Sequence, residues 1–329
     1  MGKALLYSRE LNNYFKSKGY TYIKPYSIVN NNDTVFITSG IQPILSDYRE
    51  SKLENEKKLY VPQPVIRTKI LGKVEDGISI AFINPTLASF NISEEEYKRT
   101  VKDFIDLLYE NGLSKDNIGM KNKNYERLWG DLLVTGRKTF YYYKDIELGD
   151  STFFTSITKD GKSIGIDTMS DLGFGLERLR WCVNDDSYFN LYTDKTNLSN
   201  EVKVYLSALA LLAVNDVYPS NKNAGYRTRM FSKRLVEILN GNLLVKEQED
   251  YLLECINYWK DWQSREDNID ISMLKNEHVR NCNRHFIDQL LDEGYQNVSG
   301  ININVSPEEF IRRLLSSGVD TSRVKKYKR

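Results

Sequence analysis

Short runs in which hydrophobic and polar residues alternate fill much of the first half of the chain. Runs of strand character lie at residues 20–23, 35–38, 59–68, 78–83, 139–143, 151–157 and 163–166. Most of them follow one another with no helix between, which favours an antiparallel sheet. Helical spacing is found at residues 4–18 and again at 93–111, where Ser93 and Glu96 form the capping-box pattern that begins a helix.

Helical periodicity dominates from about residue 197 onward. Residues 202–214 are nearly all apolar, which predicts a buried helix, and further helices are predicted at 226–240, 271–293 and 306–318. The basic tail at 323–329 is expected to be a frayed, solvated end. The chain is therefore predicted to have an α+β fold, with an antiparallel sheet flanked by helices in a domain at 1–195 and an all-helical domain at 196–329.

Composition narrows the classes of function. The chain has 329 residues, 40% of them hydrophobic, with 46 basic and 45 acidic side chains, so any surface that binds nucleic acid must be local. The cysteines at 182, 255 and 282 match no zinc spacing and are interpreted as reduced core thiols, with no structural zinc. No apolar run reaches the length of a membrane span, so a soluble, cytoplasmic protein with no membrane partner is expected.

The segment Gly173–Leu179 reads Gly-Phe-Gly-Leu-Glu-Arg-Leu and places an arginine in the first turn of a helix that follows two glycines. Glycine has no Cβ, so a ligand can approach the backbone closely. Arg178 keeps its charge and offers a planar fork to phosphate or a flat face to a purine. Alone, the segment is more typical of a plain turn between a strand and a helix.

The ordered segments 27–43, Val65-Ile66-Arg67 and Gly173–Arg178 together resemble the class II aminoacyl-tRNA synthetases, and most closely the alanyl-tRNA synthetases. Trp129-Gly130, followed by Thr135-Gly136, is similar to a further catalytic segment of that family. Residues 213–229, and more loosely 318–321, are similar to its tRNA-recognition part. The resemblance implies a class II catalytic sheet over 1–195, acceptor-stem recognition by 196–329, and no editing domain or C-terminal module.

The resemblance implies roles for residues that bind ATP and the amino acid. Arg67 would hold the α-phosphate and Arg178 the far end of a bent ATP whose phosphates are bridged by Mg²⁺, so these two are the catalytic candidates. The ATP site implied in this way comprises Arg67, Glu75, Gly175 and Arg178, and the amino-acid site comprises Trp129, Asp150 and Asp167. Asp167 would pair with the α-ammonium group, Trp129 would wall a small side-chain pocket, and Asp150 stands where the family has an asparagine. From the residues alone, Trp129 could instead be a core aromatic, and the two aspartates could be turn residues.

For RNA, the resemblance implies that Asn221 and Asp320 face base edges of the acceptor stem. The phosphate contacts would come from the basic residues Arg227, Arg229, Lys233 and Arg234. The alternative is a charged helix face in water.

The return strand of the ATP hairpin departs from the family. Ile83 or Asn84 would stand where the family has the aromatic that stacks on adenine, Pro85 replaces a glutamate, and Phe82 could substitute if the register shifts by one or two residues. Two hypotheses result. The chain activates alanine, or another small amino acid, with ATP and transfers it to tRNA(Ala) or a tRNA-like acceptor. Alternatively, it is an adenylation-deficient paralogue that binds tRNA(Ala) or alanyl-tRNA as a regulator or a biosynthetic transferase. A third possibility is transfer to a carrier protein or a small molecule.

Overall fold

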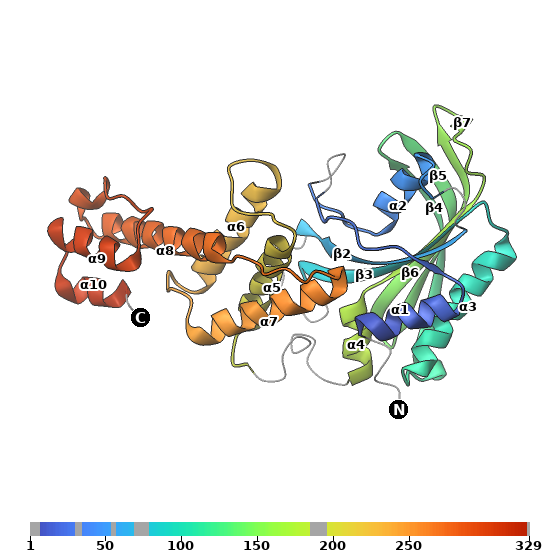
Figure 1. The fold of residues 1–329 in the computed structure, drawn as a ribbon, viewed down its shortest axis with the longest axis horizontal. Helices are drawn as coiled ribbons and strands as arrows, with labels where there is room; N and C mark the ends of the chain where they lie inside the picture. Colours follow the sequence, from blue (N-terminus) through green and yellow to red (C-terminus); the bar gives the residue numbers. More distant parts are fainter. Residues whose placement is uncertain (1–6, 30–34, 54–56, 69–78, 185–195, 328–329) are drawn as a thin grey trace. The chain divides into compact units, whose positions relative to one another are not determined.

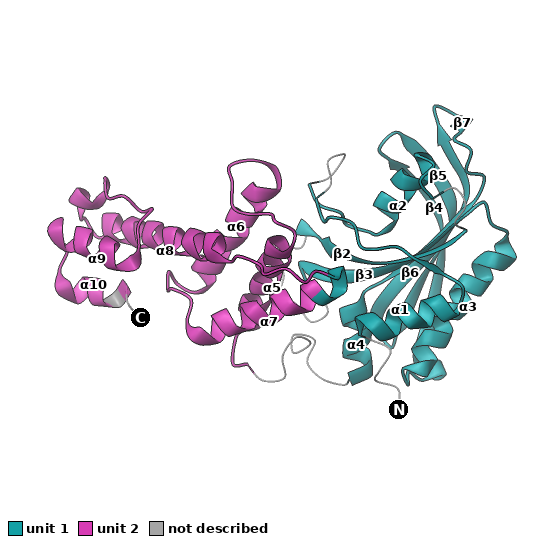
Figure 2. Ribbon diagram, in the orientation of Figure 1, with its two compact units in different colours: residues 1–191, 261–264 teal, residues 192–260, 265–329 magenta. Residues whose placement is uncertain are grey.

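The computed structural model describes residues 7–29, 35–53, 57–68, 79–184 and 196–327. The chain divides into two compact units, one formed by residues 1–191 with 261–264 and the other by 192–260 with 265–329 (Figure 2). The domain boundary predicted between 195 and 196 lies close to this division.

Unit 1 is built on one eight-stranded sheet. Its strand order is β1 (Thr21–Tyr22), β2 (Lys58–Ile66), β3 (Ala81–Phe90), β8 (Met169–Phe174), β6 (Ile146–Lys159), β5 (Leu132–Tyr143) and β4 (Ile118–Trp129), and β7 (Lys162–Ser163) also pairs with β6. Every pairing is antiparallel except that of β1 with β2. With the helices described below, this architecture confirms the predicted fold class.

Helices cover both faces of the sheet (Figure 1). On one face, Phe15 of α1 (Ser8–Ser17) contacts Tyr60 of β2, and Phe104 of α3 (Glu94–Glu110) contacts Tyr141 of β5. On the other face, α2 (Ile41–Arg49) packs into a core cluster with residues of five strands, among them Val61, Val134 and Met169. Helix α4 (Leu176–Asn184) follows β8 directly. The predicted capping box at Ser93 and Glu96 is present and begins α3.

Some predicted strands differ from the observed ones. Residues 35–38 form no strand and contribute only an isolated bridge between Val29 and Phe36, and the run at 163–166 is shortened to the end of β7. Strands β4 and β8 were not predicted. Most of β4 is exposed, so Lys121-Asn122-Lys123-Asn124 shows no alternation of polar and apolar residues. Strand β8 was concealed by Ser170 and Asp171, which are polar residues on adjacent positions.

The second part of the chain is helical, as predicted. Its helices are α5 (Asn200–Val214), α6 (Asn223–Ile238), α7 (Lys246–Gln263), α8 (Ser272–Asp292), α9 (Pro307–Ser316) and α10 (Thr321–Tyr327). Helix α5 is buried from Val202 to Val214, whereas α7 was not predicted. The expectation of a frayed tail is wrong for α10, because Tyr327 is buried against Phe286 and Phe310 and Arg323 pairs with Glu293. No helix in the described ranges combines the length and apolar character needed to cross a membrane.

Candidate functional site

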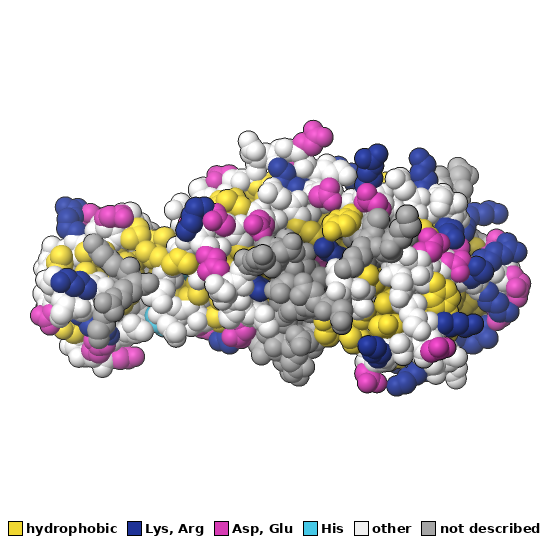
Figure 3. All heavy atoms as spheres, turned by 90° about the horizontal axis from the view of Figure 1, so that it is seen from below, with side chains coloured by type: hydrophobic (Ala, Val, Ile, Leu, Met, Phe, Trp, Pro, Cys, Tyr) yellow, Lys and Arg dark blue, Asp and Glu magenta, His cyan; other side chains and the backbone are white. Residues whose placement is uncertain are grey.

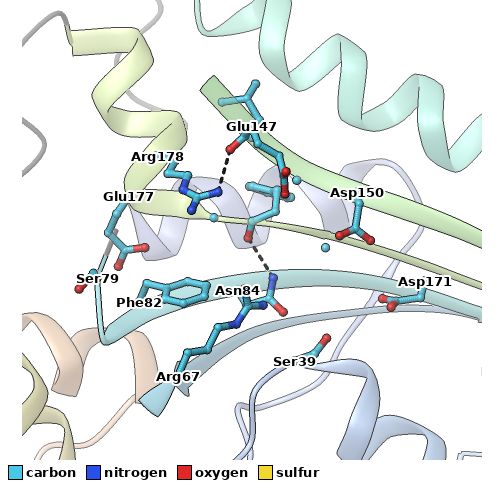
Figure 4. Close-up of a pocket in the computed structure, with 15 residues that line it drawn as sticks. Ser39, Arg67, Ser79, Phe82, Asn84, Glu147, Asp150, Asp171, Glu177 and Arg178 are labelled. Atoms are coloured by element: carbon cyan, nitrogen blue, oxygen red, sulfur yellow. Dashed lines mark hydrogen bonds between the residues drawn. The ribbon is translucent and has the colours of Figure 1, made fainter. Parts of the chain in front are cut away.

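A pocket opens on the face of the sheet that also carries α2. It contains about 850 Å³ of space, part of which is open to solvent. Its wall is formed by residues of unit 1 from strands, a helix and the segments that join them, namely Ser39, Arg67, Ser79, Phe82, Asn84, Glu147, Leu148, Gly149, Asp150, Asp171, Gly173, Phe174, Gly175, Glu177 and Arg178. Figure 4 shows the charged members pointing into the same space from different elements. Arg67, Arg178, Gly175 and Asp150, to which the resemblance gives roles in binding ATP or the amino acid, all line this pocket.

Two arginines supply the positive side of the pocket. The Nε and Nη2 atoms of Arg67 donate to the Thr38 carbonyl at 3.2 and 3.1 Å, and its guanidinium lies 4.8 Å from the centre of the Phe82 ring. Arg178 donates from Nη1 to the Glu147 carbonyl at 3.0 Å. Arg67 is partly exposed to solvent. Desolvation by the pocket walls and the nearby charge of Arg178 nevertheless lower the pKa of Arg67. Two neighbouring cations suit a multiply charged anion such as a polyphosphate.

Two aspartates supply the negative side. Asp150 forms an ion pair with Lys138 at 2.6 Å, whereas Oδ1 of Asp171 is buried and has no hydrogen-bond partner among the described residues. Desolvation, reinforced by the charge of Asp150, raises the pKa of Asp171 to about 7. The charge of Lys138 opposes this rise only in part, and Oδ1 of Asp171 keeps no hydrogen-bond donor among the described residues, so this position favours a ligand that brings a positively charged donor.

Glu177 joins the two walls of the pocket. Its buried carboxylate accepts the backbone N–H of Ile83, with both oxygens 3.0 Å from the nitrogen, and Asn84 donates from Nδ2 to the Phe174 carbonyl at 3.0 Å. A Cβ on Gly173 would lie 3.1 Å from that Asn84 nitrogen, so a side chain at this position would require Asn84 to shift by a few tenths of an ångström. Neither Gly173 nor Gly175 has left-handed backbone, so the expected sharp turn does not depend on glycine.

The register of the β2–β3 hairpin identifies the aromatic residue of the pocket. Val65 pairs with Phe82, Ile66 pairs with Ala81, and the N–H of Arg67 donates to Ile80 at 2.9 Å. Phe82 and Asn84 therefore face the pocket, while Ile83 points into the opposite core and is buried. Of the three residues considered for the adenine-stacking position, Phe82 is the aromatic one that lines the pocket, and the Arg67 guanidinium lies over its ring. Glu75 lies outside the described residues.

Two predicted amino-acid-binding residues do not line the pocket. Trp129 donates from Nε1 to the Tyr125 hydroxyl at 2.9 Å and packs on Phe154, so it is a core aromatic beside α2. Asp167 precedes β8 and is exposed, with its backbone N–H bonded to Asn91. Asp171 occupies the pocket instead. The sequence places Asp171 two residues before Gly173, close to the glycine motif, which is the signal that could have identified it.

The residues predicted to bind tRNA lie in unit 2. Helix α6 carries the four basic ones, of which Arg229 bonds to Asn221 and to Glu277, and Arg234 pairs with Glu237 at 3.0 Å. Asp320 accepts a hydrogen bond from Tyr295 at the start of α10. Helices α6 and α10 lie apart in unit 2 (Figure 1), so Asp320 does not join Asn221 and the α6 cations, Arg227 and Lys233 among them, in one cluster.

Comparison with known proteins found one kind of similarity, to solved structures. The sequence matches no family model, and it matches no curated protein. A solved structure with some similarity is that of PylSc from Desulfitobacterium hafniense, a pyrrolysyl-tRNA synthetase, with a TM-score of 0.39 and 17% identity over 56% of this chain and 68% of that chain. Similarity at this level carries no functional conclusion, which has to rest on the pocket and the sequence motifs.

Proposed function

We propose that unit 1 binds ATP and a small amino acid in this pocket and joins them as an aminoacyl-adenylate. Alanine is the first candidate, because the motif pattern resembles the alanyl-tRNA synthetases, and the aminoacyl group would pass to tRNA(Ala) or a tRNA-like acceptor. The observation that carries the proposal is that Arg67 and Arg178 line the same pocket as Asp171, whose buried Oδ1 has no hydrogen-bond donor among the described residues. Such a pocket is complementary to a substrate pair with phosphate at one end and an ammonium group at the other.

The chemistry can be assigned to residues of the pocket. A carboxylate oxygen of the amino acid attacks the α-phosphorus of ATP, a P–O bond forms, and the bond to pyrophosphate breaks. Arg67 neutralises negative charge that develops on the α-phosphate, and Phe82 and Arg178 offer two flat groups between which adenine can stack. No set of three or more His, Cys, Asp or Glu residues in the described ranges could hold a metal ion, so Mg²⁺ would be bound mainly by the phosphates that it screens.

The acidic side of the pocket would bind the amino acid. The α-ammonium group would pair with Asp171 and remove the cost of its buried charge. Asp150, which is paired with Lys138, lines the pocket together with Asp171. The choice of a small amino acid rests on the sequence motifs alone.

The test is amino-acid-dependent exchange of pyrophosphate into ATP, measured with alanine, glycine and serine. We expect exchange with at least one of them, a loss of 100-fold or more (about 3 kcal/mol) in Arg67→Ala and Asp171→Asn, and normal exchange in the control Asp167→Asn. No exchange with any small amino acid would contradict the proposal.

A second candidate is a paralogue that binds tRNA(Ala) or alanyl-tRNA without adenylation. It is favoured by the hairpin, because the N–H of Ile83 is already bonded to Glu177 and Pro85 has no N–H, which leaves the strand few donors for the purine edge. Binding of tRNA(Ala) with no measurable ATP affinity would support this candidate, and ordinary ATP binding would contradict it.

A further inference from the structure

A strip of basic and aromatic side chains lies beside the pocket on the same face of the sheet. Lys121 of β4 is directly opposite Phe140 of β5, and Phe140 is directly opposite Asp150, which lines the pocket. Directly opposed residues share a face, and alternate residues of a strand do as well. We define the basic-aromatic strip as Lys121, Lys123 and Arg127 of β4 with Phe140 and Tyr142 of β5.

The cations of the strip are exposed and uncompensated. In the described part of the chain, no ion pair joins Lys121, Lys123 or Arg127 to a carboxylate. Lys123 stands directly opposite Lys138, which is paired with Asp150, whereas Lys123 itself has no carboxylate partner among the described residues. The other face of β4 holds no cation, since its residues are Met120, Asn122, Asn124, Glu126 and Leu128. The positive charge of β4 is therefore confined to the pocket face.

The aromatic rings of the strip are available as flat platforms. Phe140 and Tyr142 are half-buried. The Nζ atoms of Lys123 and Lys138 lie 5.0 and 5.2 Å from the Phe140 ring centre, and the Nζ of Lys121 lies 4.9 Å from the Tyr142 ring centre. An exposed lysine gains little from such a contact, and less than a nucleic-acid base gains from stacking on the same ring. A bound strand can therefore place its bases on the rings while Lys121 and Lys123 turn to its phosphates.

We propose that the basic-aromatic strip binds single-stranded RNA whose end reaches the pocket. Cations two residues apart on a strand are about 7 Å from each other, a separation similar to that of successive phosphates in an extended single strand. Backbone cations with interleaved aromatic rings are the combination used to bind single strands with little sequence preference. An acidic polypeptide would use the cations but leave the rings without a role. The proposal is independent of the adenylation chemistry, because none of the strip residues lines the pocket.

The experiment measures binding of a fluorescein-labelled 12-nucleotide RNA of mixed sequence to the full-length chain by fluorescence anisotropy between 50 and 200 mM salt. The triple variant Lys121→Gln, Lys123→Gln, Arg127→Gln should bind at least tenfold more weakly, with a log–log salt slope smaller by about 2. Phe140→Leu and Tyr142→Leu should each weaken binding about 5- to 150-fold and leave the slope unchanged. The matched control Lys98→Gln, Lys102→Gln, Lys115→Gln removes the same charge from exposed positions of unit 1 and should bind like the parent.

Several outcomes would overturn the proposal. They are an equal loss of RNA binding in the matched control, unchanged RNA binding in the strip triple variant, and a loss of RNA binding that occurs only when Arg227, Lys233 and Arg234 of α6 are changed. Binding of poly-glutamate in place of RNA would assign the strip to an acidic protein partner instead. Failure of pyrophosphate exchange with intact RNA binding would reject the adenylation chemistry alone. Circular dichroism of each variant separates weak binding from loss of fold.

Discussion

Asp171 gives the sharpest prediction, because its buried charge should limit the stability of the ligand-free protein above neutral pH. The pKa of Asp171 is about 7 in the folded chain, against an ordinary value of 3.8. The folded state therefore favours the protonated carboxyl. The stability that protonated Asp171 allows is fully present below pH 4, and it is lost as the pH rises through 7, where the carboxyl ionises in the folded chain. At 1.36 kcal/mol for each pH unit, the ceiling of the effect is about 4 kcal/mol. Since the side chain is only partly buried at the pocket wall, we expect about 1–3 kcal/mol.

The assay compares urea unfolding of the parent and of Asp171→Asn from pH 4 to pH 8. The variant should match the parent near pH 4 and become more stable than it by about 1–3 kcal/mol at pH 8, with Asp167→Asn as a control that shows no such trend. Addition of the amino acid that supports pyrophosphate exchange should abolish the difference in stability between parent and variant at pH 8, because its ammonium group compensates the Asp171 carboxylate. A stability difference that stays constant between pH 4 and pH 8 would refute the reasoning, since Asp171 would then carry no uncompensated charge.

Three further predictions concern other residues. Phe82→Leu should weaken ATP binding about 5- to 150-fold in calorimetry and leave the amino-acid KM unchanged, whereas Phe82→Tyr should bind ATP normally. Glu177→Gln should lower the free energy of unfolding by about 1–3 kcal/mol in urea, because the buried N–H of Ile83 loses a charged acceptor, and an unchanged midpoint would argue against the contact. Burial lowers the pKa of His278 to about 4, so its neutral form stabilises the fold above pH 6.5 and about 3 kcal/mol should be lost as the pH falls to 4. His278→Gln should not show that loss, and identical pH profiles would contradict the assignment.

The sequence predicted the parts of this protein that depend on local patterns. Alternation located most strands, a capping box placed the start of α3 at Ser93, and an apolar run gave buried α5. Strand β4 could not be found in this way, because it forms its hydrogen bonds at the edge of the sheet while both of its faces are largely exposed. Helix α10 was concealed by its basic residues, since the contacts that hold Tyr327 come from helices distant in the sequence.

The candidate site was predicted unevenly for a similar reason. Arg67 and Arg178 belong to short motifs with fixed spacing, so the sequence identified them as candidates. The register of the hairpin could not be predicted, because it depends on which residues pair across the two strands, and only the fold gives that pairing. Trp129 was assigned to the pocket from its motif, but strand pairing places its side chain beside Phe154 in the core. Asp171 was passed over in favour of Asp167 because burial, which gives Asp171 its unusual chemistry, is a property of the folded sheet.

The hydrogen bond between Glu177 and the backbone of Ile83 has a mechanical consequence. Ile83 adjoins Phe82 in sequence, and Glu177 adjoins Arg178, so the bond clamps together the two backbone segments that carry the flat groups of the pocket. The bond therefore resists separation of these two backbone segments, whereas the side chains of Phe82 and Arg178 can still rotate. Loss of the bond would let the strand and the start of the helix move independently of each other.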